Sequence, residues 1–278
     1  MLIIDQLSLQ LPYYASWWKR DWATCLEELS LRFSAGDVHA VVGASGAGKS
    51  LLAYAVMGLL PASARLNGQL YYHGKPLDEA RQHQLRGREL ALIPQSLKAL
   101  DPLVRTHRQV AWAAQRAGWP AMSAWRSAQQ ALDHYRLDSR AQQAFAHELS
   151  GGMARRVLTA MAHVSQAQFI IADEPTVGLD PQQRQRVLDA LRALADQGKT
   201  VMLITHDLRH ALSIADRVTI MRDGKQIETA CASAFSGSGC SLTSSYSRTL
   251  WQALPDNSFL TSAVSQMQQH SQKEVNVA

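Results

Sequence analysis

The sequence predicts an α/β fold in which parallel strands and helices alternate around one core. Short apolar runs, rich in β-branched residues, recur along the chain between helical or turn segments, as buried parallel strands do. One long stretch has helical spacing and almost no β-branched runs, and a turn pattern near the end of the core indicates a hairpin. A chain of 278 residues can bury a large core that carries such an inserted subdomain.

The predicted strands follow one another along the chain. The first, Val38 to Val42, leads directly into a glycine-rich loop, after which an apolar helical pattern starts at Leu51. Three further strands are predicted at residues 90–93, 169–172 and 201–205, each flanked by helical or turn material. We therefore expect a strand, a loop and a helix at the start of the core, followed by further strands of the same parallel sheet.

The remaining segments are arranged around this core. Between residues 96 and 166, Ala, Arg, Gln and Trp at helical spacing predict an inserted helical subdomain. Asp223 and Gly224 supply the turn of a hairpin over residues 217–228. Residues 233–245, rich in Ser and Gly, are expected to form a linker, and the last dozen residues, which are polar, to be disordered. The sequence has no internal repeat, which indicates a single unit.

Composition limits the classes of protein to which the chain can belong. No uninterrupted apolar stretch approaches the roughly 18 to 20 residues that cross a bilayer, so work at a membrane requires a partner. The first residues lack a basic leader and a cleavage site, and we expect a cytoplasmic protein. The net charge of +5 is scattered, which favours a solvated surface over a nucleic-acid site. Cys25, Cys231 and Cys240 lack the short paired spacing of metal sites and are expected to be structural or incidental.

The segment GASGAGKS at residues 43–50 matches the phosphate-loop pattern completely, with a strand before it and a helix after it. Its glycines let backbone N–H groups turn inward around phosphates, Lys49 adds a positive charge, and Ser50 adds a hydroxyl ligand for Mg²⁺. A chance glycine loop would lack that context. The predicted nucleotide-binding residues here are Gly43, Ala44, Ser45, Gly46, Ala47, Gly48, Lys49 and Ser50.

Two adjacent acids end the apolar strand in FIIADEP at residues 169–175. A purely structural strand end seldom needs both, although a helix cap or surface turn is the simpler alternative. Two acids permit two roles. Asp173 can hold a metal through water, and Glu174, which points elsewhere, can polarise the attacking water as a general base.

A second helix start occurs in ELSGGMARR at residues 148–156. Ser150 is expected to cap the helix, and Gly151 and Gly152 let a ligand approach the backbone. This is a second phosphate-binding helix start, about a hundred residues after the first. Because one nucleotide hardly needs two such cradles, the pattern predicts a dimer that encloses two ATP molecules between its subunits.

Over residues 1–230, this ordered set of motifs resembles the ATP-binding cassette (ABC) family. By that resemblance, GASGAGKS is the Walker A loop, Gln95 in IPQS the Q-loop glutamine, LSGGM the signature, FIIADE Walker B, Gly178-Leu179-Asp180 the D-loop, and His206 in ITHD the switch histidine. The family implies that Gln95 contacts Mg²⁺ or the attacking water, and that His206 contacts the γ-phosphate and positions Glu174. The expected catalytic set is Glu174, His206 and Gln95; the expected metal set is Ser50, Gln95 and Asp173.

The resemblance also implies the architecture and the partners. The fold is that of an ABC ATPase: a phosphate-loop NTPase core with a parallel sheet, an antiparallel β subdomain and an inserted helical subdomain. Residues 1–95 and 166–230 form the core, residues 96–165 the helical subdomain with the signature, and residues 231–278 a C-terminal extension. The implied cofactors are ATP and Mg²⁺. The implied partners are permease subunits, a second ABC ATPase subunit and, indirectly, a periplasmic or extracellular binding protein, at the cytoplasmic face of the inner or plasma membrane and without nucleic acid.

Within the family, the chain resembles the dipeptide, oligopeptide and nickel importers. Met153 stands where most signatures have Gln, and PQSLKALDPL at residues 94–103 is similar to their segment after the Q-loop. The chain lacks the cysteine-rich extension of the peptide members, which favours nickel or a metal chelate as substrate, with a peptide as the alternative. Ala154-Arg155-Arg156 departs from the usual Arg-Gln-Arg, and residues 244–255 resemble the C-terminal motif only loosely.

Three questions stay open at this point. One is whether the chain is instead an ABC ATPase that acts on nucleic acid or ribosomes, against which the single cassette and modest insert argue. Another is a purely regulatory nucleotide-binding subunit, against which the presence of Glu174 and His206 argues. The third is which aromatic residue stacks on adenine; we favour Tyr13 or Tyr14 over Trp17, Trp18 and Trp22.

Overall fold

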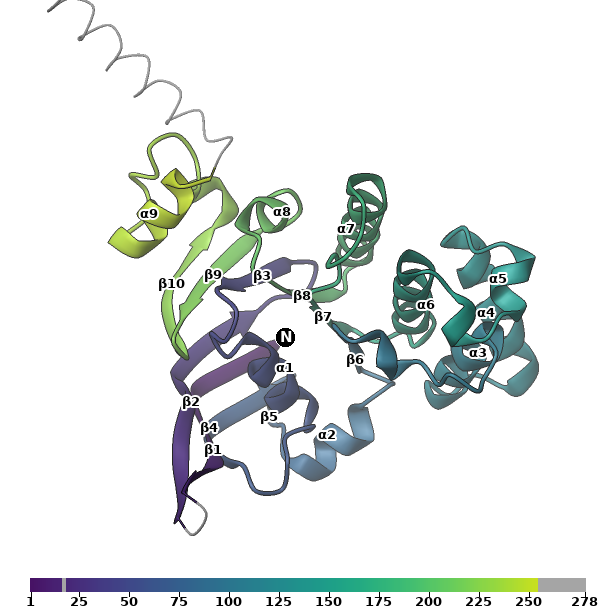
Figure 1. Ribbon diagram of the computed structural model, residues 1–278, viewed down its shortest axis with the longest axis horizontal. Coiled ribbons are helices and arrows are strands. Elements are labelled where there is room, and N and C mark those ends of the chain that lie inside the picture. The colour runs from purple at the N-terminus through teal and green to yellow at the C-terminus, as the bar shows by residue number, and fades with distance from the viewer. Residues whose placement is uncertain (17–18, 255–278) are drawn as a thin grey trace, which may run out of the picture.

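In the computed structural model, residues 1–16 and 19–254 are described, apart from the side chains of residues 15, 16 and 19. They form two sheets and a set of helices (Figure 1). One sheet is antiparallel, in the order β2-β1-β4-β5, and the other is mixed, in the order β10-β9-β3-β8-β7-β6. The predicted α/β class is confirmed. None of the described helices is both long enough and apolar enough to cross a membrane.

The mixed sheet carries the predicted parallel strands. Its members are β3 (Val38–Gly43), β6 (Leu90–Ile93), β7 (Phe169–Asp173), β8 (Thr200–Thr205), β9 (Arg217–Arg222) and β10 (Lys225–Cys231). All pairs are parallel except β9 with β10, which form the predicted hairpin. β3, β7 and β8 are buried along their whole length, and their sequences are accordingly rich in apolar residues. Their carboxyl ends meet at one edge of the sheet, where such folds bind ligands.

The antiparallel sheet lies beside the first helix of the core. It consists of β1 (Leu2–Ser16), β2 (Lys19–Phe33), β4 (Arg65–Tyr72) and β5 (Lys75–Pro76). Helix α1 (Lys49–Met57) packs against both sheets, and α2 (Glu79–Leu85) packs against α1. Apolar side chains from β1, β2, α1 and one face of the mixed sheet form a single cluster that fixes α1 beneath its loop.

The chain between β6 and β7 is helical. It contains η1 (Leu97–Ala99), α3 (Thr106–Arg116), α4 (Ala121–His134), α5 (Ser139–Gln143), η2 (Ala146–Glu148) and α6 (Gly151–Val164). Buried alanines, among them Ala114, Ala124 and Ala128, let α3, α4 and α6 pack closely. Helix α6 also contacts β6 and α7 (Pro181–Asp196), so it joins the helical segment to the core (Figure 1).

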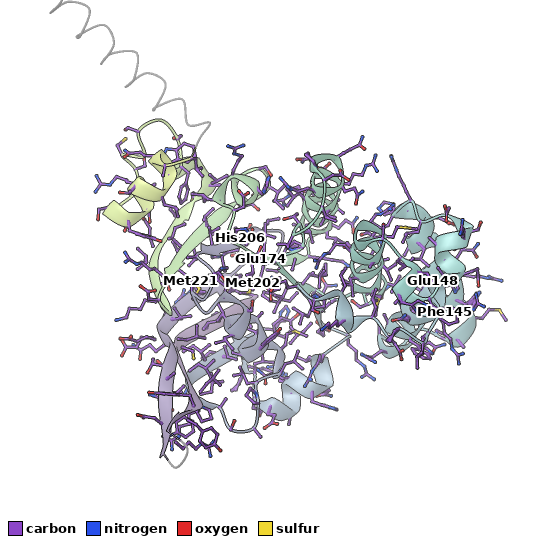
Figure 2. All side chains as sticks on the ribbon, in the orientation of Figure 1. Phe145, Glu148, Glu174, Met202, His206 and Met221 are labelled. Carbon is purple, nitrogen blue, oxygen red and sulfur yellow. The ribbon has the colours of Figure 1, made fainter. Side chains whose placement is uncertain are left out.

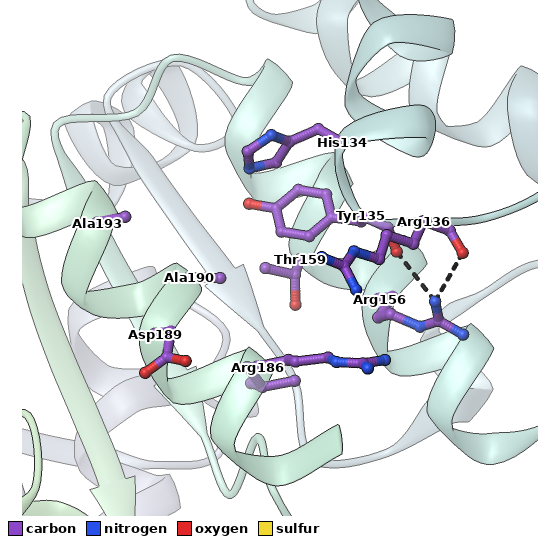
Figure 3. A pocket seen from close by; sticks show the side chains of 10 residues that line it. His134, Tyr135, Arg136, Arg156, Thr159, Arg186, Asp189, Ala190 and Ala193 are labelled. Carbon is purple, nitrogen blue, oxygen red and sulfur yellow. Dashed lines mark hydrogen bonds between the residues drawn. The ribbon is translucent and has the colours of Figure 1, made fainter. Parts of the chain in front are cut away.

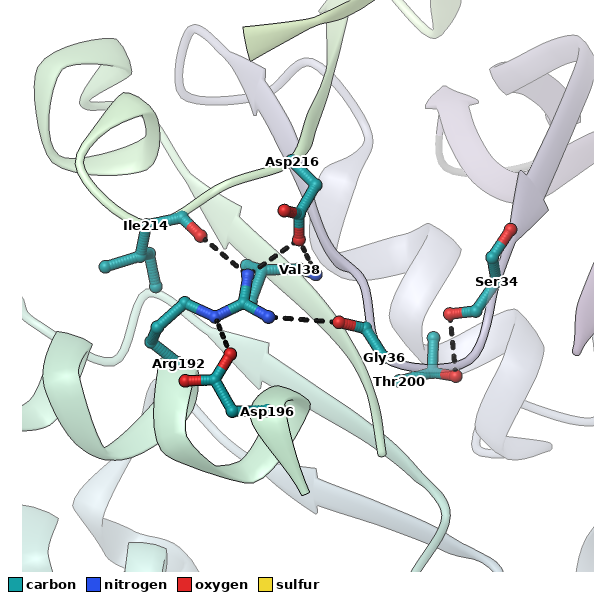
Figure 4. A network of polar contacts seen from close by, with 8 residues as sticks. All are labelled: Ser34, Gly36, Val38, Arg192, Asp196, Thr200, Ile214 and Asp216. Atoms are coloured by element: carbon teal, nitrogen blue, oxygen red, sulfur yellow. Dashed lines mark hydrogen bonds and ion pairs between the residues drawn. The ribbon is translucent and has the colours of Figure 1, made fainter. Parts of the chain in front are cut away.

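Helix α7 is fixed to the sheet by one arginine. The Arg192 guanidinium donates to Asp216 at 2.6 Å, to Asp196 at 2.8 Å and to the carbonyl of Gly36 at 3.0 Å (Figure 4). Asp216 in turn accepts from the backbone N–H of Val38 at 2.8 Å. The network therefore ties α7 to the start of β3, the strand that leads into the glycine loop.

The prediction that residues 233–245 form a linker is wrong. The segment begins with the end of η3 (Ala232–Ala234) and leads into α9 (Ser245–Gln252), and it packs on the mixed sheet. Phe235 and Leu242 are 5% and 2% exposed, and the Glu228 carboxylate accepts hydrogen bonds from the backbone of Thr243 and Ser244. Burial of the Phe235 and Leu242 side chains stabilises the packed conformation of this segment despite its Ser- and Gly-rich composition. The last dozen residues, predicted to be disordered, lie outside the described part of the chain.

Candidate active site

The glycine loop joins β3 to α1, and its three glycines are required for different reasons. Gly46 and Gly48 have φ of 84° and 91°, in the left-handed region that favours glycine. A Cβ at Gly43 would lie 2.3 Å from the carbonyl oxygen of Met221, and one at Gly48 2.8 Å from that of Cys25. A Cβ at Gly46 would meet no atom within 4 Å. Glycine at positions 43 and 48 thus lets the loop pack closely against β9 and β2. At Gly46 the loop faces open space, where a ligand can bind.

Lys49 begins α1 and turns back over the loop. Its Nζ donates to the carbonyls of Gly43 at 2.7 Å and Ala44 at 2.9 Å, and the residue is 6% exposed. Burial lowers the pKa of the Lys49 ammonium, while the nearby charges of Glu174 and Asp173 raise it. The ammonium is thereby held next to the open side of the loop, where a phosphate group would meet it.

Ser50 and Asp173, both predicted metal ligands, are brought together. The Ser50 side chain makes a hydrogen bond to the Asp173 carboxylate, which is 1% exposed. Burial raises the pKa of Asp173, and the Ser50 bond opposes that rise. Among the described residues, Asp173 Oδ1 is buried without a hydrogen-bond partner. A hydroxyl and an unpartnered carboxylate oxygen are the hard donors that Mg²⁺ prefers, so the residues fit this ion.

Glu174 and His206 form a direct pair. Glu174 follows β7 with φ of 47°, an unusual backbone conformation for glutamate, and its N–H donates to the carbonyl of Ile204 at 2.9 Å. His206 Nδ1 lies 2.9 Å from Glu174 Oε1, and Figure 2 shows the two residues side by side. Glu174 Oε2 is buried and has no partner among the described residues. One carboxylate oxygen is therefore oriented by His206 and the other is left for a reactant.

These residues surround a cavity of about 590 Å³. Its lining consists of Ala44, Ser45, Gly46, Gly48, Lys49, Ser50, Leu51, Gln95, Glu174, Val177 and His206. Gln95 reaches it from the end of β6. Of the predicted loop residues, Gly43 and Ala47 do not line the cavity, and Ala47 is 4% exposed within the hydrophobic core. Leu51 and Val177 were missed by the sequence argument, since neither carries a polar group to draw attention.

The signature residues lie elsewhere. Ser150 caps α6, as predicted, with its Oγ accepting from the backbone N–H of Met153 at 3.3 Å. Ser150 and Gly151 are exposed, and none of Ser150, Gly151 and Gly152 lines the cavity. A Cβ at Gly152 would lie 1.7 Å from Gln183 Oε1, so a larger residue there requires the flexible end of the Gln183 side chain on α7 to move. That constraint comes from a distant segment and could not be seen in the motif.

Three of the aromatic candidates for stacking on adenine lie on β1 and β2: Tyr13, Tyr14 and Trp22. Tyr13 and Tyr14 are 47% and 75% exposed, and neither lines the cavity. Trp22 is stacked under the guanidinium of Arg65, which lies 3.6 Å from its ring centre. Trp17 and Trp18 lie outside the described residues. The choice among these aromatics stays a prediction.

The phosphate loop, the buried acidic pair at the end of β7 and the helical insert define an ATP-binding cassette. Residues 26–177 match the ABC transporter family, and the chain belongs to that family. In fold, it is similar to a dimeric cassette, MJ0796, bound to ADP and Pi, with a TM-score of 0.73 at 23% identity over 84% of this chain and 99% of that one. It is also similar to an ATP-binding subunit of an ABC transporter, with a TM-score of 0.71 at 25% identity over 84% and 91%. The fold is that of an ABC ATPase.

The chain is also similar to proteins named oligopeptide transport ATP-binding protein OppD. It is 37% identical to the protein of Mycobacterium tuberculosis over 222 residues, which cover 76% of this chain and 36% of the relative. It is 32% identical to the protein of Haemophilus influenzae over 213 residues, or 74% of this chain and 66% of the relative. The chain thus spans about a third of the mycobacterial relative and about two thirds of the other.

Proposed function

We propose that the chain is the ATP-hydrolysing subunit of an ABC importer and drives a membrane permease from the cytoplasmic face of the membrane. The observation that carries the proposal is the pairing of Glu174 with His206 beside Lys49 and Ser50. A site that only binds nucleotide has no need of an oriented carboxylate with one oxygen left unpartnered. This feature argues for hydrolysis over a regulatory role.

Each residue has one task in this proposal. Lys49 and the loop N–H groups bind the phosphates of ATP, and Glu174 accepts a proton from the attacking water while His206 holds its other oxygen. Ser50, Asp173 and Gln95 would hold Mg²⁺, which when bound neutralises charge on the phosphates. The Lys49 ammonium is held on the loop carbonyls of Gly43 and Ala44 before the nucleotide arrives, so little reorganisation opposes the reaction.

The signature completes the site from a second subunit. Ser150, Gly151 and Gly152 form an exposed helix start that lies outside the chain's own cavity. Backbone N–H groups at such a helix start attract phosphate oxygens. We propose that they cover the nucleotide held by a partner ATPase subunit, so that two chains close on two ATP molecules. The core of residues 1–95 and 166–230 and the helical subdomain of residues 96–165 would then move together with the permease.

For the substrate, we propose a peptide. The relatives are named for oligopeptide transport, which supports the peptide alternative over nickel or a metal chelate. The same names argue against action on nucleic acid or ribosomes. An extracellular or periplasmic binding protein would deliver the substrate to the permease. ATPase assays on the purified complex, with peptides, nickel and metal chelates added in turn, decide among these substrates.

The substitution Glu174→Gln tests the catalytic part. A general base contributes about 10²- to 10⁴-fold in rate, so the variant is expected to bind ATP normally and to lose turnover by that factor. Phosphate release and binding of a fluorescent ATP analogue are measured on the same samples. Hydrolysis near the wild-type rate would exclude Glu174 as the base, and co-purification with ribosomes or nucleic acid in place of a permease would exclude the importer.

A further inference from the structure

Arg155 is a buried charge that the proposed function does not use. It lies in the first turns of α6, five residues after Ser150, and it is 4% exposed. A buried guanidinium is costly unless it meets opposite charge or hydrogen-bond acceptors, so its surroundings indicate why the chain keeps it.

Among the described residues, the Arg155 side chain makes a hydrogen bond that leads to the Q-loop. The Arg155 guanidinium donates to the carbonyl of Pro94 at 2.8 Å. Pro94 is the residue between β6 and Gln95, which lines the nucleotide cavity. The bond therefore fixes the backbone next to Gln95 to the helix that begins at the signature.

Its charge balances the acidic pair. Burial lowers the pKa of Arg155, while Asp173 and Glu174 raise it, and Arg155 in turn lowers the pKa of Asp173. Arg155 Nε, Asp173 Oδ1 and Glu174 Oε2 are all buried without hydrogen-bond partners among the described residues. Together with Lys49, the guanidinium gives two positive charges against the two carboxylates. Replacing it with glutamine would leave a net negative charge beside the phosphates of ATP.

We propose that Arg155 is a positioning residue that holds Gln95 at the cavity and offsets the charge of the acidic pair, so that the site accepts ATP before the metal is bound. The predicted effect of Arg155 on turnover rests on the proposed function. The predicted effect of Arg155 on ATP binding does not require hydrolysis. It also places the residue on the same helix as the signature, so movement of α6 would reach Pro94 and Gln95 directly.

Binding is measured with a non-hydrolysable ATP analogue in EDTA and again in Mg²⁺. Charges at short range interact strongly even at an effective dielectric constant of about 20, so we expect Arg155→Gln to lower the affinity in EDTA about tenfold. The affinity in Mg²⁺ is expected to fall less, because the ion compensates for the missing charge. Arg155→Lys keeps the charge and is expected to keep the wild-type ratio of the two affinities.

The neighbouring Arg156 provides the matched control. Its guanidinium donates to the carbonyls of Tyr135 and Arg136 inside the helical segment, beside a separate cavity of about 280 Å³ (Figure 3). Arg156→Gln is expected to lower stability and to leave the ratio of affinities unchanged. If Arg155→Gln lowers both affinities equally, or neither, its role is structural and the proposal is overturned.

The link to Gln95 is tested by a double-mutant cycle on turnover. Arg155→Lys cannot reproduce the planar guanidinium, so it is expected to lower kcat, and Gln95→Ala is expected to lower it too. If Arg155 acts through Gln95, the double variant is little worse than Gln95→Ala alone; additive losses would contradict the link. This cycle also decides the matter if Arg155→Gln fails to fold. Absence of ATPase activity in the wild-type protein would refute the proposed function. The affinities measured in EDTA and in Mg²⁺ would still test the role of Arg155 in binding.

Discussion

The two ends of the proposed machinery, the phosphate-loop cavity and the signature helix start, are built in opposite ways. At the cavity, Lys49, Asp173 and Glu174 are no more than 6% exposed, and each is held by contacts within the chain. At the signature, Ser150 and Gly151 are exposed, and Ser150 accepts local hydrogen bonds from the backbone N–H groups of Met153 and Ala154.

This difference follows from the chemistry that each end presents. The cavity uses charged side chains, which require partners and burial to stay in place without a ligand. The signature uses the N–H groups of a helix start, which water can satisfy until a phosphate replaces it. One chain therefore contains a preorganised nucleotide-binding cavity and, apart from it, a signature helix start that has no phosphate to bind within the same chain. Loss of the Lys49 ammonium at the cavity should therefore change nucleotide binding in the isolated chain, whereas a small substitution at the exposed Gly151 should change only turnover.

The largest effect on nucleotide affinity is expected from Lys49→Ala. Loss of the ammonium removes charge-assisted bonds to the phosphates, and we expect the affinity for ATP to fall about a hundredfold. Titration of a fluorescent ATP analogue measures it. Lys75→Ala, at an exposed lysine on β5, is the control and should bind as the wild type does. Unchanged affinity in Lys49→Ala would refute the assignment of the loop.

A smaller effect concerns the strand beneath the loop. His39 in β3 is 1% exposed, and burial, followed by the charge of Arg217, lowers its pKa to about 4, while a hydrogen bond with Arg32 opposes the shift. The unfolded chain keeps a histidine pKa near 6.5, so His39 stabilises the fold fully above that pH and loses this contribution as pH falls towards 4. Between pH 7.5 and 5 we expect a loss of about 2 kcal/mol in the free energy of unfolding.

Urea unfolding at several pH values measures this loss. The variant His39→Gln removes the titration and is expected to show a flatter pH dependence, although its stability at neutral pH falls because the bond between His39 Nε2 and Thr219 Oγ1, 2.8 Å long, is changed. Equal slopes for variant and wild type would show that another group carries the pH dependence. The signature end has no buried histidine in its helix start, so the effect belongs to the cavity region.

Much of the cavity could be predicted because its information is local. Continuous apolar runs define β3, β7 and β8, and the loop, the acidic pair and His206 each follow directly after a strand. A parallel sheet brings such strand ends together, so chain order alone predicts that Lys49, Glu174 and His206 are neighbours.

What the sequence could not provide depends on distant contacts. The backbone carbonyl of Met221 requires glycine at Gly43, and the Gln183 side chain must move if Gly152 is replaced, yet both glycines appear in their motifs only as ligand-binding residues. The burial of Arg155 depends on how α6 packs against β6. In the C-terminal extension, Phe235 and Leu242 find a surface to pack on, which composition over residues 233–245 does not reveal.

Substitution of the two signature glycines is expected to change ATP binding least. It also gives the sharpest test of the difference between the cavity and the signature helix start. A Cβ at Gly151 would have its nearest contact at 3.9 Å from Leu97 Cδ1, whereas one at Gly152 would collide with Gln183 of the same chain. Gly151→Ala should therefore fold as the wild type does and bind ATP normally in the isolated chain. If a partner's nucleotide approaches this helix start, the added methyl group displaces it, and turnover should fall at least about tenfold.

Gly152→Ala separates this effect from a local packing defect. It is expected to lower the unfolding temperature slightly, because the end of the Gln183 side chain must move, and to lower turnover as well. Thermal unfolding and phosphate release are measured for both variants. A loss of turnover in Gly151→Ala without loss of stability locates the missing contact outside the chain, on the nucleotide of a second subunit. Full turnover in Gly151→Ala would mean that the signature glycines serve only the packing of α6 on α7, and that the cavity works without a second chain.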